Sequence, residues 1–442
     1  MQMTRLSTQT NVIVPDAHGD WLNQRDDSFS RFIEIGDKKN PRNALFKLYS
    51  SGLKTARDAW VYGSSIDRIK ENVDRMFATY NQQVKEFDFD SSNFEFVRDD
   101  KLIHWNRTLE NFFKRGVRNL SFDPHSLYRS IYRPFFPQHC YFNKYANDMT
   151  YQIPLLFPSN EMENLAICSS GVGSKEYSCL MVDHIPCLDF LEKTQCFPRW
   201  LPGEQTKGAE DTLDFGEPSE MPSGFSQEAL PRFQAAYPGK PITEDDLFYY
   251  IYGILHSEDY RTRYANNLMK ELPRIPRVAT YEQFMAFVEA GQELARLHVH
   301  FEDVAPYAGV KIEYTKVGQP SYRVTQMKWG KIKGKTGNAA KDKTTLIYND
   351  WITVKNIPLE AQEYVVNKKS ARDWVVERAC VSIDKASGIV NDFNDYAAEM
   401  GSERYPLDLF LKVITVSLET MKIVKALPKL EIHQLDKEAS VD

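Results

Sequence analysis

The densest cluster of side chains that could do chemistry is a lysine-rich run suited to binding phosphate. Residues 311–355 contain ten basic residues and three acidic ones, a net charge of +7. Ammonium groups on a Gly-containing loop can neutralise the phosphates of a nucleic-acid backbone. The sequence therefore predicts phosphate contacts from six lysines of this run: Lys328, Lys331, Lys333, Lys335, Lys341 and Lys343.

Three polar side chains of the run could form hydrogen bonds to DNA bases. Arg323, Gln326 and Asn338 carry groups that can pair with base edges in a major groove. Lysine–phosphate contacts, in contrast, carry no sequence information. The alternative interpretation is a solvated hairpin tip whose lysines only keep an edge strand from aggregating. Composition alone leaves both interpretations open.

Motifs for catalysis are missing. Gly330–Thr336 resembles a phosphate-binding loop, but three residues separate its glycines where four are required. The six cysteines form no CxxC pair, and no ligand cluster accompanies His298 and His300. The sequence also lacks the D/N/S-P-P-Y/F/W tetrapeptide of amino-methyltransferases. We therefore expect no catalytic residue, no metal site and no cofactor in this chain.

The spacing of apolar residues indicates how the run is positioned. Alternation at period two in residues 310–315, 321–329, 344–348 and 351–354 predicts strands. The Gly- and Lys-rich stretch 330–343 connects two of them and becomes the tip of a basic β-hairpin over residues 321–355. Spacing of three and four residues predicts helices at 65–87, after Thr243 and Thr280, and at 407–427. The expected fold class is α+β, with helical segments packed around small antiparallel sheets in two lobes.

An acidic stretch rich in Pro and Gly separates the two lobes. Residues 203–246 contain ten acidic and three basic residues, and eleven Pro and Gly residues lie within 201–241. Because Pro and Gly disfavour helices and central strands, we expect a linker or long surface loop at 201–241. It separates an N-terminal lobe, 1–200, which is β-rich or irregular after its long helix, from a C-terminal α+β lobe, 242–442. The overall charge of −6 averages this stretch with the basic hairpin, so it does not exclude nucleic acid.

The sequence also indicates a compartment. No apolar run approaches the roughly 18 residues that a membrane span requires. The N-terminus lacks the apolar core of a signal peptide, and the cysteines lack the spacing of a disulfide framework. We expect a cytoplasmic protein without a membrane partner.

Seven sequence blocks resemble the C-terminal part of Type ISP restriction–modification enzymes. They follow the order of that family and span about residues 13 to 430. The blocks are Asp20–Asp27, Gly52–Tyr62, Ser130–Phe135, Thr194–Arg199, Phe248–Ser257, Leu272–Pro276 and Ser382–Asp392.

This resemblance implies a function. In that family one polypeptide joins a nuclease, a helicase-like ATPase translocase, a coupling region, an adenine-N6 methyltransferase and a C-terminal target-recognition domain. The chain would be the last part, with residues 1–200 on the methyltransferase side. It would recognise a specific site in double-stranded DNA, as part of bacterial defence against phage, and would not be an enzyme on its own. S-adenosylmethionine, ATP and Mg²⁺ would serve the other modules, present in cis or in trans.

The resemblance also suggests a role for residues 54–60, where the methyltransferase side would meet the recognition side. Lys54 and Arg57 would bind phosphate, and Trp60 would stack near an extruded adenine. The alternative is an internal ion pair between Arg57 and Asp58 beside a buried Trp60. For the whole chain, the alternative function is a non-enzymatic module that docks the methyltransferase or helicase part without being the main reader of DNA.

Overall fold

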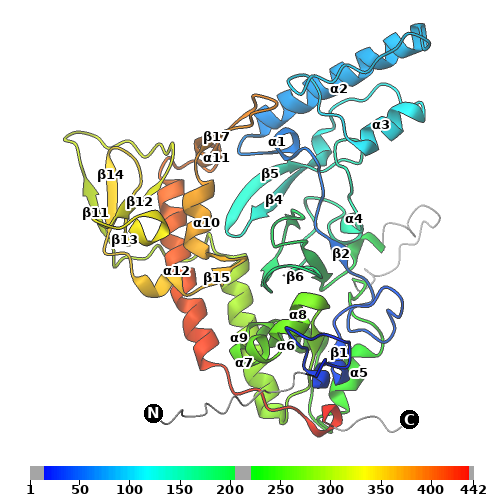
Figure 1. Cartoon of the computed structure of the whole chain (residues 1–442), viewed down its shortest axis with the longest axis vertical. Coiled ribbons are helices and arrows are strands. Elements are labelled where there is room, and N and C mark those ends of the chain that lie inside the picture. The colour runs from blue at the N-terminus through cyan, green and yellow to red at the C-terminus, as the bar shows by residue number, and fades with distance from the viewer. Residues whose placement is uncertain (1–13, 205–220, 438–442) are drawn as a thin grey trace, which may run out of the picture.

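The chain forms a mixed fold of helices and small sheets (Figure 1). The computed structural model describes residues 14–204 and 221–437. Twelve α-helices and six sheets within these ranges confirm the expected α+β class. The helices are α1 (Asp58–Val61), α2 (Ile66–Phe89), α3 (Arg107–Lys114), α4 (Ile153–Leu156), α5 (Ala229–Gln234), α6 (Glu244–His256), α7 (Glu258–Arg263), α8 (Ala265–Lys270), α9 (Tyr281–Val299), α10 (Ala371–Arg378), α11 (Phe393–Glu399) and α12 (Tyr405–Ala426).

Three four-stranded sheets make up most of the β-structure. The first has the order β2 (Ser50–Ser51), β9 (Gln195–Pro198), β6 (Ala166–Ser169) and β7 (Cys179–Val182). The second has the order β3 (Tyr62–Gly63), β5 (Phe136–Tyr141), β4 (Leu127–Arg133) and β8 (Ile185–Pro186). The third has the order β11 (Lys311–Tyr314), β14 (Ile352–Lys355), β13 (Lys341–Ile347) and β12 (Lys328–Lys331). All neighbouring strands are antiparallel except the β4–β8 pair.

Short strand pairs and single turns of 3-10 helix complete the structure. The pairs are β1 (Ile33–Glu34) with β10 (Arg274–Ile275), β15 (Val365–Val366) with β16 (Lys369–Ser370), and β17 (Val381–Ile383) with β18 (Val390–Asp392). The 3-10 turns are η1 (Asp27–Arg31), η2 (Pro124–Ser126), η3 (Pro202–Glu204), η4 (Gly337–Ala340), η5 (Leu359–Gln362) and η6 (Gln434–Asp436).

Helix starts follow the polar caps of the sequence. At α6, Thr243 and Asp246 form a reciprocal capping box, and at α9 the Thr280 hydroxyl accepts from the N–H of Gln283. The helix expected at 65–87 corresponds to α2, whose N-cap is Ser65. The helix expected at 407–427 corresponds to α12, which ends two residues before Pro428.

The Gly- and Lys-rich stretch 330–343 spans the turn between β12 and β13, in a sheet on one flank of the molecule (Figure 1, left). The strand expected at 321–329, however, begins only at Lys328. Side chains hold the preceding segment in place of a strand ladder: Asn349 Nδ2 donates to the carbonyls of Ser321 and Arg323, and Tyr348 Oη to that of Tyr322. The alternation therefore reflects the partial burial of Tyr322 and the burial of Val324, not sheet pairing, and Met327 is buried out of phase with it.

The Pro- and Gly-rich stretch is more ordered than the sequence suggests. Residues 205–220 lie outside the described ranges, but α5 forms within residues 221–241 and buries Phe233. Pro231 is tolerated because it lies in the first helical turn, where backbone N–H groups have no intrahelical acceptor.

Two apolar cores cut across this stretch. One core joins residues from Leu53–Leu201 with residues from Phe301–Val416. The other joins Phe29–Phe46 and four side chains of β6, β7 and β9 to residues 225–295. Each core thus draws on both sides of the expected 201–241 boundary, and the assignment of separate lobes to 1–200 and 242–442 stays a prediction. Helices α9 and α12 run side by side (Figure 1); α9 contributes to the second core and α12 to the first.

Candidate nucleic-acid interface

The β12–β13 hairpin presents free ammonium groups to solvent. Five of the six predicted phosphate ligands are exposed and form no ion pair with any residue that the structure describes: Lys328, Lys331, Lys333, Lys335 and Lys341. An unpaired lysine keeps its full charge available to an anionic partner. The hairpin is therefore a concentrated positive surface.

Four of these five lysines line a single groove of about 1010 Å³ between the hairpin and α10; Lys333 does not. The opposite wall contains Lys368 and Lys369 of the β15–β16 hairpin. We call this site the lysine groove. Its seven lysines are Lys328, Lys331, Lys335, Lys341, Lys343, Lys368 and Lys369, and its carboxylates are Asp373 and Glu377.

Sequence reasoning missed the second wall. Asn367 and Lys368 form a two-residue turn with φ of 49° and 69°, the left-handed conformation at both central positions of a tight hairpin turn. The available signal was Val365-Val366 followed by Asn367, a residue that tolerates this conformation. Nothing local indicates that this turn faces a hairpin some thirty residues earlier.

Lys343, the sixth predicted phosphate ligand, is half-buried and already paired within the protein. Its ammonium pairs with Asp373 and lies 4.4 Å from the ring centroid of Trp329. Asp373 also accepts from Trp329 Nε1 at 2.8 Å and from Gln362 Nε2 at 3.0 Å. Partial burial lowers the pKa of Lys343. This network joins the lysine-rich hairpin to the first turn of α10 and so fixes the shape of the groove.

The three base-reading candidates are placed differently. Gln326 is exposed and lines the lysine groove. Arg323 is exposed as well, but its guanidinium pairs with Asp392, the N-cap of α11. The side chain of Asn338 lies outside the described part of the structure. Their reading of bases remains a prediction.

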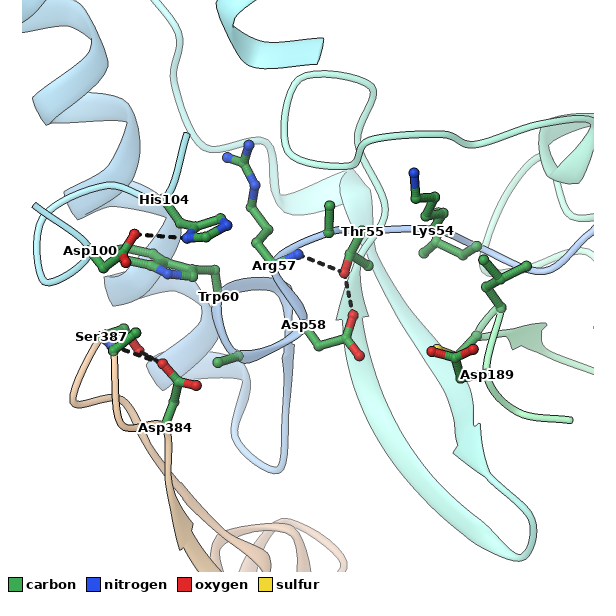
Figure 2. A pocket seen from close by; sticks show the side chains of 16 residues that line it. Lys54, Thr55, Arg57, Asp58, Trp60, Asp100, His104, Asp189, Asp384 and Ser387 are labelled. Atoms are coloured by element: carbon green, nitrogen blue, oxygen red, sulfur yellow. Dashed lines mark hydrogen bonds and ion pairs between the residues drawn. The ribbon is translucent and has the colours of Figure 1, made fainter. Parts of the chain in front are cut away.

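Lys54, Arg57 and Trp60 line a separate pocket of about 460 Å³, which shares no lining residue with the lysine groove (Figure 2). Four carboxylates, Asp58, Asp100, Asp189 and Asp384, line it against the two cationic side chains of Lys54 and Arg57. Lys54 is already paired, with its Nζ 2.7 Å from Asp148 Oδ2. This distribution of charge disfavours phosphate inside the pocket.

Arg57 and Trp60 are buried, with exposed fractions of 4% and 2%. Arg57 Nη1 lies 2.8 Å from Met76 Sδ, while its Nε and Nη2 have no hydrogen-bond acceptor. Burial lowers the pKa of Arg57 to about 9. The alternative Arg57–Asp58 ion pair does not form in the described structure. Asp58 instead accepts from Thr55 (Figure 2) and from Tyr132 Oη at 2.9 Å. Direct DNA contact by Lys54, Arg57 and Trp60 stays a prediction.

Other chemistry does not assemble in the described residues. No group of three or more His, Cys, Asp or Glu side chains there could hold a metal ion. The six cysteines are free thiols, and five are buried. Among the described helices, none is long and apolar enough to cross a membrane. The lysine groove is therefore the site whose chemistry is most distinctive.

Comparison with known proteins gives the family. Residues 44–409 match the model of the Type ISP C-terminal specificity domain. The chain therefore belongs to this family of specificity domains, as its sequence blocks predicted. Among curated protein sequences, none matches it.

Solved structures agree with this assignment. The ATP-dependent Type ISP restriction-modification enzyme LlaBIII bound to DNA is similar to the chain, with 33% identity and a TM-score of 0.81 over 95% of the chain. A nuclease-deletion mutant of the Type ISP enzyme LlaGI in complex with a DNA substrate mimic matches with 31% identity and a TM-score of 0.78, also over 95%. The DrdV–DNA complex matches with 32% identity and a TM-score of 0.78 over the same share. The chain covers 26%, 36% and 40% of these three chains, respectively.

Proposed function

We propose that this chain recognises a specific site in duplex DNA for a Type ISP restriction–modification system. It would position the DNA for a linked adenine-N6 methyltransferase and a translocase–nuclease. The observation that carries the proposal is the set of exposed, unpaired lysines on the β12–β13 hairpin.

Several cationic side chains elsewhere on the surface are paired, whereas five unpaired lysines of the hairpin fall within residues 328–341. Lys316 pairs with Asp350, Lys425 with Glu363 and Arg118 with Asp88, so those charges are compensated within the protein. A two-stranded ribbon also has the dimensions to enter a major groove, where base edges are distinguishable. That two similar enzymes are described as complexes with DNA or a DNA mimic supports the same partner here.

We assign the reactions of the system to modules outside this chain. The similar structures are two and a half to four times as long as their matched part, which leaves room for such modules. Methyl transfer would use S-adenosylmethionine, and translocation and cleavage would use ATP and Mg²⁺, in those modules. This chain would bind the duplex DNA and position its target site for those modules.

The test is the salt dependence of duplex binding by the chain. For the wild type, log Kobs should fall linearly with log[salt], by about 0.9 for each phosphate neutralised. Changing Lys331, Lys333 and Lys335 to Ala should make that slope shallower by about 3 and weaken binding to all sequences alike. Lys39→Ala, Lys101→Ala and Lys114→Ala together are the matched control, since all three are exposed lysines on other surfaces. Undetectable or salt-insensitive binding by the wild type would contradict the proposal.

A docking module remains the second candidate, because large apolar side chains are exposed away from the groove. Trp21 is 62% exposed, Leu22 76% and Phe89 94%. If docking is the main function, the triple lysine variant keeps its DNA affinity, and Trp21→Ser with Phe89→Ser loses association with the methyltransferase module.

A further inference from the structure

The lysine groove has two walls from distant parts of the sequence, and this arrangement defines a ligand more narrowly than a basic surface does. We propose that the groove holds one phosphodiester backbone of the duplex, running between the β12–β13 hairpin and the β15–β16 turn. This inference rests on the proposed function, because it takes DNA as the partner. It adds Lys368 and Lys369 as phosphate ligands and assigns the groove to backbone rather than to bases.

The charge of the groove favours a polyanion. Seven lysines against two carboxylates give a formal net charge of +5 within about 1010 Å³. Both carboxylates already have cationic partners in the protein: Asp373 pairs with Lys343, and the exposed Glu377 pairs with Arg378 as well as with Lys369. A series of phosphates is the ligand that can meet ammonium groups on both walls at once.

The floor of the groove is unsuited to bases. Trp329 lines it but is 9% exposed, and Lys343 and Arg372 lie 4.4 and 5.1 Å from its ring centroid. Its Nε1 donates to Asp373. No open aromatic face is therefore offered for stacking, which is the usual means of holding unpaired bases.

Geometry explains why a single backbone would lie there. A ribbon that enters a major groove is flanked by the two backbones that border it. The side of the hairpin that faces α10 carries the lysine groove, so the backbone on that side would pass between its walls. The hairpin tip, with Lys333 outside the groove, remains free to approach the bases.

The second wall is fixed before DNA arrives. The backbone N–H of Asn367 donates to Ser178 Oγ at 2.9 Å, which anchors the turn to the segment before β7. Lys368 Nζ lies 3.3 Å from Glu192, and Lys369 lies 4.5 Å from the ring centroid of Trp374. Exposed ion pairs of this kind are weak, so phosphates can replace the carboxylates without rearranging the turn.

The experiment compares the two walls in the full chain. Random-sequence duplex DNA is titrated at several salt concentrations with the wild type, with Lys331→Gln/Lys335→Gln, and with Lys368→Gln/Lys369→Gln. Each pair should make the slope of log Kobs against log[salt] shallower by about 2, one for each lysine lost. Lys368→Arg/Lys369→Arg should retain the wild-type slope, and Lys39→Gln/Lys114→Gln serves as the control for total charge.

The outcomes separate this inference from the proposed function. If the hairpin pair weakens binding while Lys368→Gln/Lys369→Gln binds like the wild type, the chain binds DNA but not between these walls, and the inference is overturned. If the wild type fails to bind duplex DNA, the proposed function falls, and this inference with it. Lys369 packs on Trp374, so Lys368→Gln alone, with an expected change of about 1, replaces the pair if the pair does not unfold cooperatively.

Discussion

His298 illustrates at the residue scale how burial decides the role of a titratable group. Its Nδ1 lies 2.6 Å from Tyr252 Oη and its Nε2 2.9 Å from Thr420 Oγ1, so it connects α6, α9 and α12. Burial, with a smaller effect of Arg261, lowers the pKa of His298 to about 3. The pKa of the neighbouring buried His256 is also well below its usual value, chiefly because of burial.

This arrangement predicts loss of stability in mild acid. An unfolded histidine binds a proton near pH 6.5. Below that pH, His298 and His256 become protonated in the unfolded chain but stay neutral in the folded protein. For His298 this difference persists down to about pH 3. The contribution of these histidines to the free energy of unfolding should be complete above about pH 6.5. Below that pH the free energy of unfolding should fall by about 1.4 kcal/mol per pH unit for each histidine.

Urea unfolding between about pH 7 and 5 measures this slope. His298→Gln should make the slope shallower by one histidine, whereas Gln292→Ala, at an exposed position of the same helix, should leave it unchanged. Equal slopes for His298→Gln and the wild type would show that His298 titrates normally in the folded protein.

At the scale of elements, two glycines set the contact between α6 and α9. A Cβ on Gly291 would lie 1.9 Å from the carbonyl oxygen of Tyr249, and a Cβ on Gly253 2.3 Å from that of Phe287. Such distances leave no room for a methyl group, so the helices meet backbone to backbone. Glycine is required here by packing, not by a special backbone conformation.

Gly291→Ala therefore tests packing against helix propensity. In an isolated helix the change would stabilise by about 1 kcal/mol. Here the added methyl group must push the helices apart, and overpacking of a core costs about 1–3 kcal/mol, so we expect net destabilisation of roughly 1–2 kcal/mol. Thermal unfolding measures the effect, with Glu289→Ala on the exposed face of α9 as the control. A raised melting temperature for Gly291→Ala would contradict the packing geometry.

At the scale of the whole molecule, each of the two apolar cores contains side chains from both halves of the chain. Strand β1 pairs with β10, with Ile33 opposite Ile275, and the side chains of Cys179, Met181 and Phe197 pack among residues 225–295. Val324, Leu346 and Phe410 pack in turn with the core formed by α2 and the first two sheets. Neither half contains a complete core.

Residues 1–200 and 242–442 produced separately should consequently fail to unfold cooperatively, because each exposes apolar faces that the other covers. Produced together, they should copurify and recover the far-ultraviolet circular dichroism of the intact chain. A sharp unfolding transition from residues 242–442 alone would instead support the two autonomous lobes that the sequence suggests.

The sequence by itself determined the local elements and the family. The periods of apolar residues place α2, α6, α9, α12, β11, β13 and β14, but not the start of β12. Spacing of three to four residues reflects one face of a helix, and spacing of two reflects one face of a strand. It also identified the lysines of the hairpin, since unbalanced charge is a property of composition. The seven family blocks indicated a specificity domain, and residues 44–409 match one.

Only the tertiary structure decided which distant segments these elements contact. The pairing of the hairpin with Lys368 and Lys369, the burial of Arg57 against Met76 and the hydrogen bonds of His298 all join segments separated along the chain. Such contacts depend on how apolar faces are buried against one another, which no local period encodes. The same lysine-rich sequence is one wall of a groove instead of an isolated tip because a distant turn packs opposite it.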